Sequence, residues 1–169
     1  MQYKNVHFIG IGGSSMNGLA QILLKNGYTV SGSDNKASAI TENLQAMGIK
    51  IYIPNAGENI QPHHEMIIFT AAIRPDNPEF IEAKKHGIPM MERSELLGNI
   101  TRAYENAVCI AGSHGKTTTT ALLAGVAVEA GLDPTVHIGA SVKNDMNNRM
   151  VQPRILYWKP VNIRTPFCN

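Results

Sequence analysis

The sequence predicts an α/β protein in which a Rossmann-like parallel-sheet domain is followed by the start of a P-loop-type α/β domain. Three observations predict this class. Short apolar runs alternate with helical segments, a glycine-rich turn follows the first run, and a second turn ending in Gly-Lys-Thr follows a later run. Apolar runs without polar interruption, separated by helices, are typical of parallel strands covered on both faces.

The first domain is predicted to span residues 1–105. Glycine residues follow two of its helices, at the position where a left-handed residue commonly ends a helix. Strands are expected at Val6–Ile9, Tyr28–Val30, Ile49–Ile53 and Met66–Phe69. Helices are expected through Leu19–Leu23, over Ala39–Met47 before Gly48, from Asn77-Pro78 to Gly87, and over Leu96 and Leu97 with Ser94 and Glu95 as the cap.

The pattern restarts around Thr101–Asn106, so a second domain is predicted over residues 106–169. A strand is expected at Ala107–Ala111, followed by a tight loop and a long helix over Lys116–Ala130 that Gly131 stops. Another strand is expected at Thr135–Ile138. The remaining chain is too short to complete a sheet of the usual size.

Composition argues against several classes of protein. Of the 169 residues, 43% are hydrophobic and 17% charged, which permits a buried core. No apolar run approaches the roughly 18–20 residues of a membrane helix, and none resembles a secretory signal, so we expect a cytoplasmic protein without a membrane partner. The net charge of +2 is dispersed, which argues against nucleic acid. Cys109 and Cys168 cannot alone form a disulfide framework or a four-ligand metal site.

The first chemical feature is the glycine-rich turn at Gly10–Gly18, between a strand and a helix. Glycines at this place allow a diphosphate to approach the helix N-terminus closely. Asp34 ends the second strand, where a dinucleotide-binding fold has its ribose-binding acid. Ser15 occupies the position of the third glycine of the dehydrogenase pattern. A nucleotide diphosphate site and a plain strand–helix turn therefore both remain open.

The second feature is the turn Gly112–Thr118, also between a strand and a helix. Backbone N–H groups of such a loop surround phosphate oxygens, Lys116 neutralises phosphate charge, and the Thr117 hydroxyl can bind Mg²⁺. The loop is shorter than the usual Gly-x4-Gly-Lys-Thr pattern, and a helix that merely begins with Gly-Lys-Thr is the alternative. We predict an ATP site, with His114 as a functional histidine.

Two weaker candidates are interpreted structurally. His63 and His64 beside Glu65 suggest a metal site, but adjacent loop residues face different ways, and solvated surface is the favoured interpretation. The methionines at positions 66, 90 and 91 are expected to fill the core rather than to bind a ligand.

Several stretches in order over residues 5–145 resemble the Mur ligase family. They are His7–Gly13 with Met16, Val30–Asp34, Thr70–Ile73, Asp76–Glu79, Arg93–Gly98 and Ala111–Thr120. The histidine before Gly115-Lys116 resembles the alanine-adding branch or the branch that recycles murein tripeptide, and both stay open.

The resemblance implies an ATP-dependent ligase that activates the carboxylate of UDP-N-acetylmuramate as an acyl phosphate, which L-alanine then attacks. ATP and Mg²⁺ are the implied cofactors, and the oligomeric state stays open. The implied substrate contacts are Gly10, Gly12, Gly13, Ser14, Ser15, Met16, Asp34, Thr70 and Ala71. The implied ATP contacts are Gly112, Ser113, His114, Gly115, Lys116, Thr117 and Thr118, with Lys116 and His114 catalytic and Thr117 on the metal.

The sequence also departs from the family pattern. Ser15, Asn17, Ser113 and Ala140 replace the usual glycine, serine, threonine and glycine. Family members are longer, so we expect an incomplete, inactive N-terminal fragment. We further expect residues 150–169 to be a shifted reading frame without native structure, since Pro160 would interrupt the next strand. An NAD(P)-dependent oxidoreductase and a non-catalytic nucleotide-binding module are the alternatives outside the ligase class.

Overall fold

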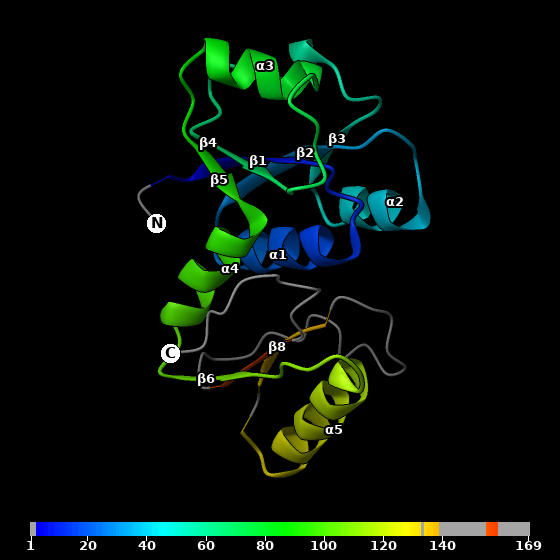
Figure 1. Ribbon diagram of the computed structural model, residues 1–169, viewed down its shortest axis with the longest axis vertical. Helices are drawn as coiled ribbons and strands as arrows, with labels where there is room; N and C mark the ends of the chain where they lie inside the picture. The colour runs from blue at the N-terminus through cyan, green and yellow to red at the C-terminus, as the bar shows by residue number, and fades with distance from the viewer. Residues whose placement is uncertain (1–2, 133, 139–154, 159–169) are drawn as a thin grey trace. The chain divides into compact units, whose positions relative to one another are not determined.

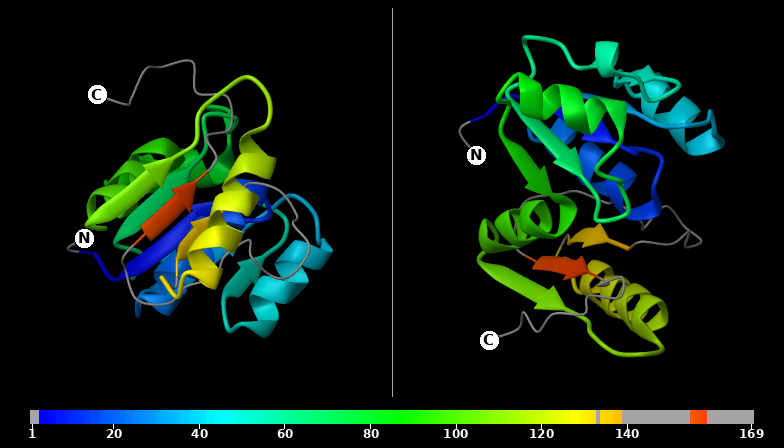
Figure 2. Two further views of the ribbon diagram at one scale, coloured as in Figure 1. Left: turned by 90° about the horizontal axis from the view of Figure 1, so that it is seen from below. Right: turned by 45° about the horizontal axis from the view of Figure 1, so that its top comes forward.

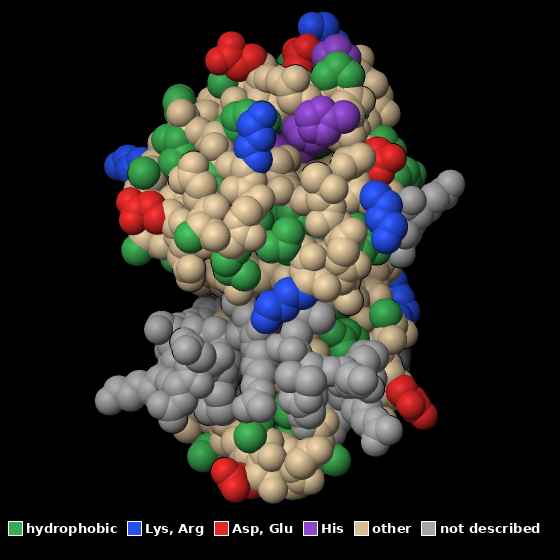
Figure 3. Space-filling view, turned by 180° about the vertical axis from the view of Figure 1, so that it is seen from behind, with side chains coloured by type: hydrophobic (Ala, Val, Ile, Leu, Met, Phe, Trp, Pro, Cys, Tyr) green, Lys and Arg blue, Asp and Glu red, His purple; other side chains and the backbone are tan. Residues whose placement is uncertain are grey.

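The computed structural model describes residues 3–132, 134–138 and 155–158, the last of these by their backbone. The chain divides into two compact units, Met1–Ile100 and Thr101–Asn169. Within the described part of the chain, no helix has the length and apolar character needed to cross a membrane. On the face shown in Figure 3, Lys and Arg side chains lie apart from one another rather than in one patch.

The first unit contains a five-stranded sheet, in which every pair of neighbouring strands is parallel. Its order β3-β2-β1-β4-β5 is that of a Rossmann-like fold and confirms the predicted parallel-sheet class. The strands are β1 (Asn5–Ile9), β2 (Thr29–Ser33), β3 (Lys50–Tyr52), β4 (Met66–Phe69) and β5 (Met90–Glu92).

Helices cover both faces of this sheet (Figures 1 and 2). The helices α1 (Ser14–Lys25) and α2 (Ala39–Ala46) lie on one face, and α3 (Pro78–Lys85) lies on the other beside the short 3-10 turn η1 (Gly57–Asn59). Ser38 begins α2 with a reciprocal capping box, and Asn77 begins α3 by accepting two backbone N–H bonds. The helix α4 (Arg93–Arg102) follows β5.

The double cover explains why the central strands bury apolar residues that are adjacent in the sequence. Phe8 and Ile9 are neighbours in β1 that point to opposite faces, and both are 0% exposed. Ile67 and Ile68 in β4 show the same pattern. The carboxyl ends of these parallel strands lie along one edge, so the loops that follow them share that edge.

The edge strand β5 and the start of α4 differ from the sequence prediction. Met90 and Met91 belong to the edge strand β5. The sequence did not predict this strand, because methionine has no strong strand preference and three residues are too few to show a periodic pattern. The last helix begins at Arg93, so Ser94 is not its cap. The Ser94 hydroxyl instead donates to Glu92 Oε1 at 2.8 Å.

The second unit contains a three-stranded parallel sheet in the order β6-β8-β7. Its elements are β6 (Asn106–Cys109), α5 (Lys116–Glu129), β7 (Thr135–His137) and β8 (Ile155–Trp158). The core of this unit packs α5 against β7 through Ala124, Ala127, Val136 and Ile138.

We expected residues 150–169 to lack ordered structure, but Ile155–Trp158 forms a strand. That this stretch is a shifted reading frame stays a prediction. The segment Ile155–Trp158 is the central strand of the sheet, paired with β6 and β7. Its four residues are aliphatic or aromatic and favour strands, and Pro160 lies beyond the strand's end, so no ladder N–H is lost within it. The expectations for residues 150–154 and 159–169, and the departure at Ala140, lie outside the described residues.

Candidate nucleotide-binding sites

The first candidate site lies at the carboxyl edge of the five-stranded sheet. The glycine loop follows β1, Asp34 follows β2, and the loop Thr70–Ile73 follows β4, so three of the predicted substrate-contact segments share this edge. A Cβ built on Gly10 would lie 3.8 Å from Ile73 Cδ1, which brings the loop after β4 next to the glycine loop. This is the crevice in which ligands of such sheets bind.

The four N–H groups at the start of the glycine loop are bonded within the protein. Those of Gly10 and Ile11 both donate to the Ser33 carbonyl, at 2.8 and 2.9 Å. Those of Gly12 and Gly13 donate to Asp34 Oδ2 at 2.9 Å and to the Gly10 carbonyl at 3.2 Å. These amides therefore shape the loop, and the predicted close approach of a diphosphate to the helix N-terminus does not depend on them.

The anion-binding capacity of the loop therefore rests on the first turn of α1. Helix geometry leaves the N–H groups of a first turn without intrahelical acceptors, and the bond from Asn17 N–H to the Gly13 carbonyl at 2.9 Å begins the regular ladder. Ser14 and Met16 lie before that point, where the helix dipole also favours negative charge.

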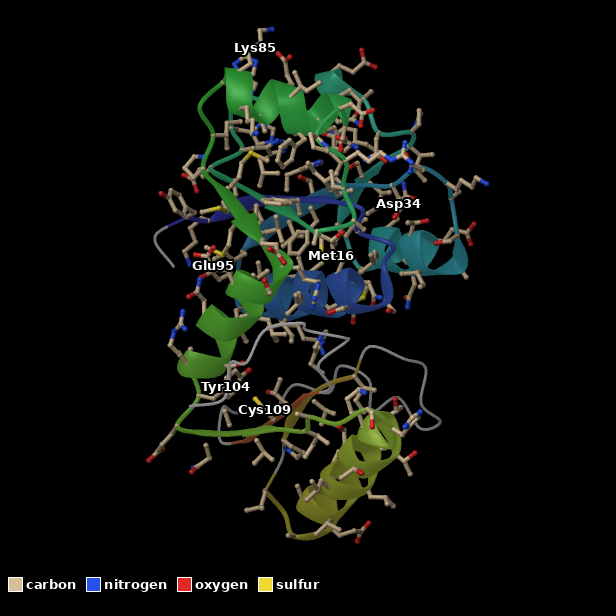
Figure 4. The ribbon with its side chains drawn as sticks, in the orientation of Figure 1. Met16, Asp34, Lys85, Glu95, Tyr104 and Cys109 are labelled. Atoms are coloured by element: carbon tan, nitrogen blue, oxygen red, sulfur yellow. The ribbon has the colours of Figure 1, made fainter. Side chains whose placement is uncertain are left out.

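Asp34 is bound to the loop and follows β2 (Figure 4). Its Oδ2 accepts the Gly12 N–H, and its Oδ1 accepts the Asn35 N–H at 2.8 Å. A Cβ on Gly12 would come within 2.7 Å of Oδ2, so the close approach of Asp34 itself requires glycine at position 12. Each carboxylate oxygen retains a second lone pair for a ligand hydroxyl.

The other predicted substrate residues differ in whether their side chains are accessible to a ligand. The Met16 side chain is 1% exposed and belongs to the core, which leaves its backbone for contact (Figure 4). Ala71 is exposed, and the half-buried Thr70 accepts the Ala72 N–H on its hydroxyl at 3.1 Å.

Arg93 is a site residue that the sequence did not single out. Its Nη1 lies 3.3 Å from Ser15 Oγ, which places a half-buried guanidinium beside the first turn of α1. Burial lowers the pKa of Arg93 from its usual value, and nearby Glu92 opposes that shift. Arg93 begins the family-like stretch Arg93–Gly98, but the sequence did not show its contact with Ser15, since the two residues lie 78 positions apart.

The second candidate site is the loop between β6 and α5. Gly115 precedes α5 with φ 79°, a left-handed conformation that glycine adopts without strain. The Lys116 ammonium donates to the Gly112 carbonyl and, at 3.0 Å, to the Ser113 carbonyl, so it lies over its own loop.

The donor set of this loop fits a nucleotide phosphate. The regular ladder of α5 begins with the bond from Thr119 N–H to the Gly115 carbonyl at 2.9 Å, so the earlier amides of the helix have no intrahelical acceptor. The first turn of α5 carries no acidic residue. Thr117 offers one hydroxyl, which suits Mg²⁺ because that ion takes few protein ligands and keeps phosphate and water as the rest. His114 is exposed beside these groups.

His64 corrects the interpretation of the His63-His64 pair as solvated surface. Its side chain is 5% exposed and stacks on the His7 ring, with 4.7 Å between the ring centroids. Burial, followed by the charges of His7 and His63, lowers the pKa of His64 to about 3.

The buried neutral imidazole of His64 predicts acid-sensitive stability. An unfolded histidine binds its proton near pH 6.5, whereas folded His64 does so only near pH 3. The contribution of neutral His64 to stability is therefore fully present above pH 6.5 and is lost as the pH falls from 6.5 towards 3. We expect the free energy of unfolding to fall by about 2 kcal/mol from pH 7 to pH 5. Urea titrations at both pH values measure it. His64→Gln should flatten the dependence, and an equally steep variant would contradict the assignment.

Comparison with known proteins shows similarity to a single family. The family model described as "Mur ligase family, catalytic domain" matches residues 5–105. UDP-N-acetylmuramate–L-alanine ligase of Lachnospira eligens is 48% identical over 147 residues, which cover 87% of this chain and 32% of that protein. The enzyme of the same name from Acetivibrio thermocellus is 50% identical over 141 residues, which cover 83% of this chain and 30% of that protein. The chain thus spans about a third of the length of these curated relatives.

Solved structures give the same result for the fold. UDP-N-acetylmuramate–alanine ligase from Thermotoga maritima matches with a TM-score of 0.85 at 30% identity, over 92% of this chain and 36% of that one. A UDP-N-acetylmuramate:L-alanyl-gamma-D-glutamyl-meso-diaminopimelate ligase from Neisseria meningitides matches with a TM-score of 0.80 at 27% identity, over 93% and 52%.

Proposed function

The chain belongs to the Mur ligase family, and from this we propose that it is part of an ATP-dependent ligase that joins L-alanine to UDP-N-acetylmuramate in peptidoglycan biosynthesis in the cytoplasm. The identity of 48–50% to relatives of that name is the observation that carries the proposal. The murein-tripeptide branch has weaker support, a structural match at 27% identity.

The first unit is proposed to hold the UDP part of the substrate. Its diphosphate would lie at the first turn of α1, where amide dipoles and the Arg93 guanidinium both favour an anion. Asp34 lies after β2, where an acid in this fold binds a ribose hydroxyl. Thr70 and Ala71 border the same edge.

The second unit is proposed to hold ATP, which supplies the phosphoryl group that activates the muramoyl carboxylate. Lys116 would exchange its loop carbonyls for phosphate oxygens and neutralise their charge. The Thr117 hydroxyl would give Mg²⁺ one oxygen ligand, and the first-turn amides of α5 would orient the phosphates. Positioned cations and donors of this kind accelerate acyl-phosphate formation without a protein nucleophile.

Substitution of Gly12 tests the UDP site. We expect Gly12→Val to weaken UDP binding at least tenfold, because the added side chain displaces Asp34 and narrows the approach to α1. Isothermal titration calorimetry with UDP measures the affinity, and thermal melting establishes that the variant is folded. An unchanged affinity in a folded Gly12→Val protein would remove the glycine loop from the proposed site.

Asp34→Asn is the matched control for that experiment. The amide oxygen still accepts the Gly12 N–H, so this bond to the loop is kept, while the carboxylate charge and the acceptor of the Asn35 N–H are lost. A smaller loss of affinity than in Gly12→Val would show that loop geometry, rather than the Asp34 charge, dominates UDP binding.

A further inference from the structure

Building on the nucleotide role proposed for the glycine loop, we propose that Glu79 is a positioning residue whose buried carboxylate fixes the end of β2 and thereby the loop. Glu79 lies in the first turn of α3, across the sheet from α1, and its side chain is 0% exposed. A carboxylate so deeply buried needs donors around it, and three side chains supply them.

The three donors converge on the two oxygens of Glu79. The Ser33 hydroxyl donates to Oε2 at 2.5 Å, Asn55 Nδ2 donates to Oε2 at 2.7 Å, and Asn59 Nδ2 donates to Oε1 at 2.6 Å. Burial raises the pKa of the Glu79 carboxyl, but the nearby His7 ring and the hydrogen bonds from Ser33 and the two asparagines outweigh burial, and the pKa lies below its usual value. Glu79 is therefore an anion that accepts every bond, which the α3 dipole also favours.

Ser33 connects this anion to the glycine loop. Its hydroxyl is held by Glu79 on one side, and its carbonyl accepts the N–H groups of Gly10 and Ile11 on the other. The next residue, Asp34, accepts the Gly12 N–H. A shift of Ser33 would thus move three consecutive loop amides and, with them, the start of α1.

A chain of hydrogen bonds with a single direction leads to the same carboxylate. The Gln61 N–H donates to His64 Nδ1 at 3.1 Å, so the neutral ring carries its proton on Nε2 and donates it to Ser31 Oγ at 3.2 Å. The Ser31 hydroxyl, which accepts the His64 proton, can then donate its own hydrogen to His7 Nδ1, 2.9 Å away.

His7 is the last member of this chain. Its remaining N–H, on Nε2, lies 3.9 Å from Glu79 Oε1, and this buried nitrogen has no hydrogen-bond partner among the described residues. The Gln61 N–H at the other end of the chain thus fixes the direction of every bond in it. As a result the His7 Nε2–H points its partial positive charge at Glu79 and favours the ionised carboxylate.

The test uses two variants of the 169-residue chain, Glu79→Gln and Ser33→Ala. Glu79→Gln places a side-chain NH2 donor against the existing donors of Ser33 or the asparagines. Ser33→Ala removes only one hydroxyl, so it is the milder variant if Glu79→Gln fails to fold. We expect both to bind UDP about tenfold more weakly and to exchange the Gly10 and Ile11 amide protons at least tenfold faster, with β4 amides unaffected. Calorimetry and amide-resolved hydrogen exchange by NMR supply the two measurements.

Ile67→Val is the matched control, because it lowers stability in the core of the same unit and replaces none of the side chains of the hydrogen-bond network. It should leave UDP affinity unchanged. Exchange of the Gly10 and Ile11 amide protons should become faster only as much as the lower global stability requires. Exchange at these amides that remains at the wild-type rate in Ser33→Ala overturns the inference. If the wild-type chain fails to bind UDP, the proposed function fails, while accelerated exchange in the variants still supports the role of Glu79 in holding the loop.

Discussion

Replacing Lys116 with alanine is expected to reduce ATP-dependent ligation by more than about a hundredfold in a chain extended to the length of the relatives. The ammonium lies over the loop carbonyls, where it is placed to meet phosphate oxygens, and no other lysine or arginine lies within residues 112–118. The measurement is phosphate release with UDP-N-acetylmuramate, L-alanine and ATP.

UDP-N-acetylmuramate binding separates loss of the ATP site from loss of the fold. Lys116→Ala should bind this substrate as the wild type does, because the glycine loop belongs to the other unit. Lys85→Ala is the control lysine, since Lys85 is an exposed residue of α3 that pairs with Glu82 (Figure 4). Turnover retained in Lys116→Ala would end the assignment of this loop to ATP.

Gly32→Ala is expected to lower the free energy of unfolding of the first unit by about 2–3 kcal/mol. A Cβ at this central position of β2 would lie 2.5 Å from Ile11 Cδ1, 2.7 Å from Ile11 Cβ and 2.9 Å from the Phe8 carbonyl oxygen. The last two atoms belong to or adjoin the backbone and cannot move aside, so the strand itself must shift. Urea denaturation monitored by circular dichroism measures the loss.

Gly57→Ala is the matched control in the same unit. Its added Cβ would meet the Pro78 carbonyl oxygen at 3.6 Å and Glu82 at 3.7 Å, which are ordinary contacts. We expect a change within about 0.5 kcal/mol. Equal effects of the two substitutions would show that the close approach at Gly32 relaxes without cost.

The strand that the sequence predicted most accurately has neighbouring apolar residues that are buried on both faces of the sheet. Met66–Phe69 agrees with the structure to the residue, because four apolar side chains in a row leave no other period to fit. Met90–Glu92 carries no such signal and becomes a strand only because β4 offers it an edge to pair with. No strand was expected at Ile155–Trp158 because of Pro160, which lies outside it.

The candidate sites were predictable where one loop contains the chemistry. Both glycine-rich turns can be recognised in the sequence, because a strand pattern precedes each and a helix pattern follows it. The residues that hold the first loop cannot be recognised in this way, since Ser33 and Glu79 are 46 residues apart and meet only in the folded protein. The domain assignment and the individual ligand contacts remain predictions that the proposed variants address.

The strand order of the second unit sets the order in which the chain can fold. In the described residues β6 and β7 pair only through β8, which follows both of them in the sequence. On a ribosome, the first sheet has all five strands once Glu92 has emerged, whereas the second must wait for Trp158. The edges of β6 and β7 stay unsatisfied during that interval, when an exposed strand edge invites pairing with another chain. Aggregation during synthesis is therefore a hazard of the second unit, and the first is protected from it early.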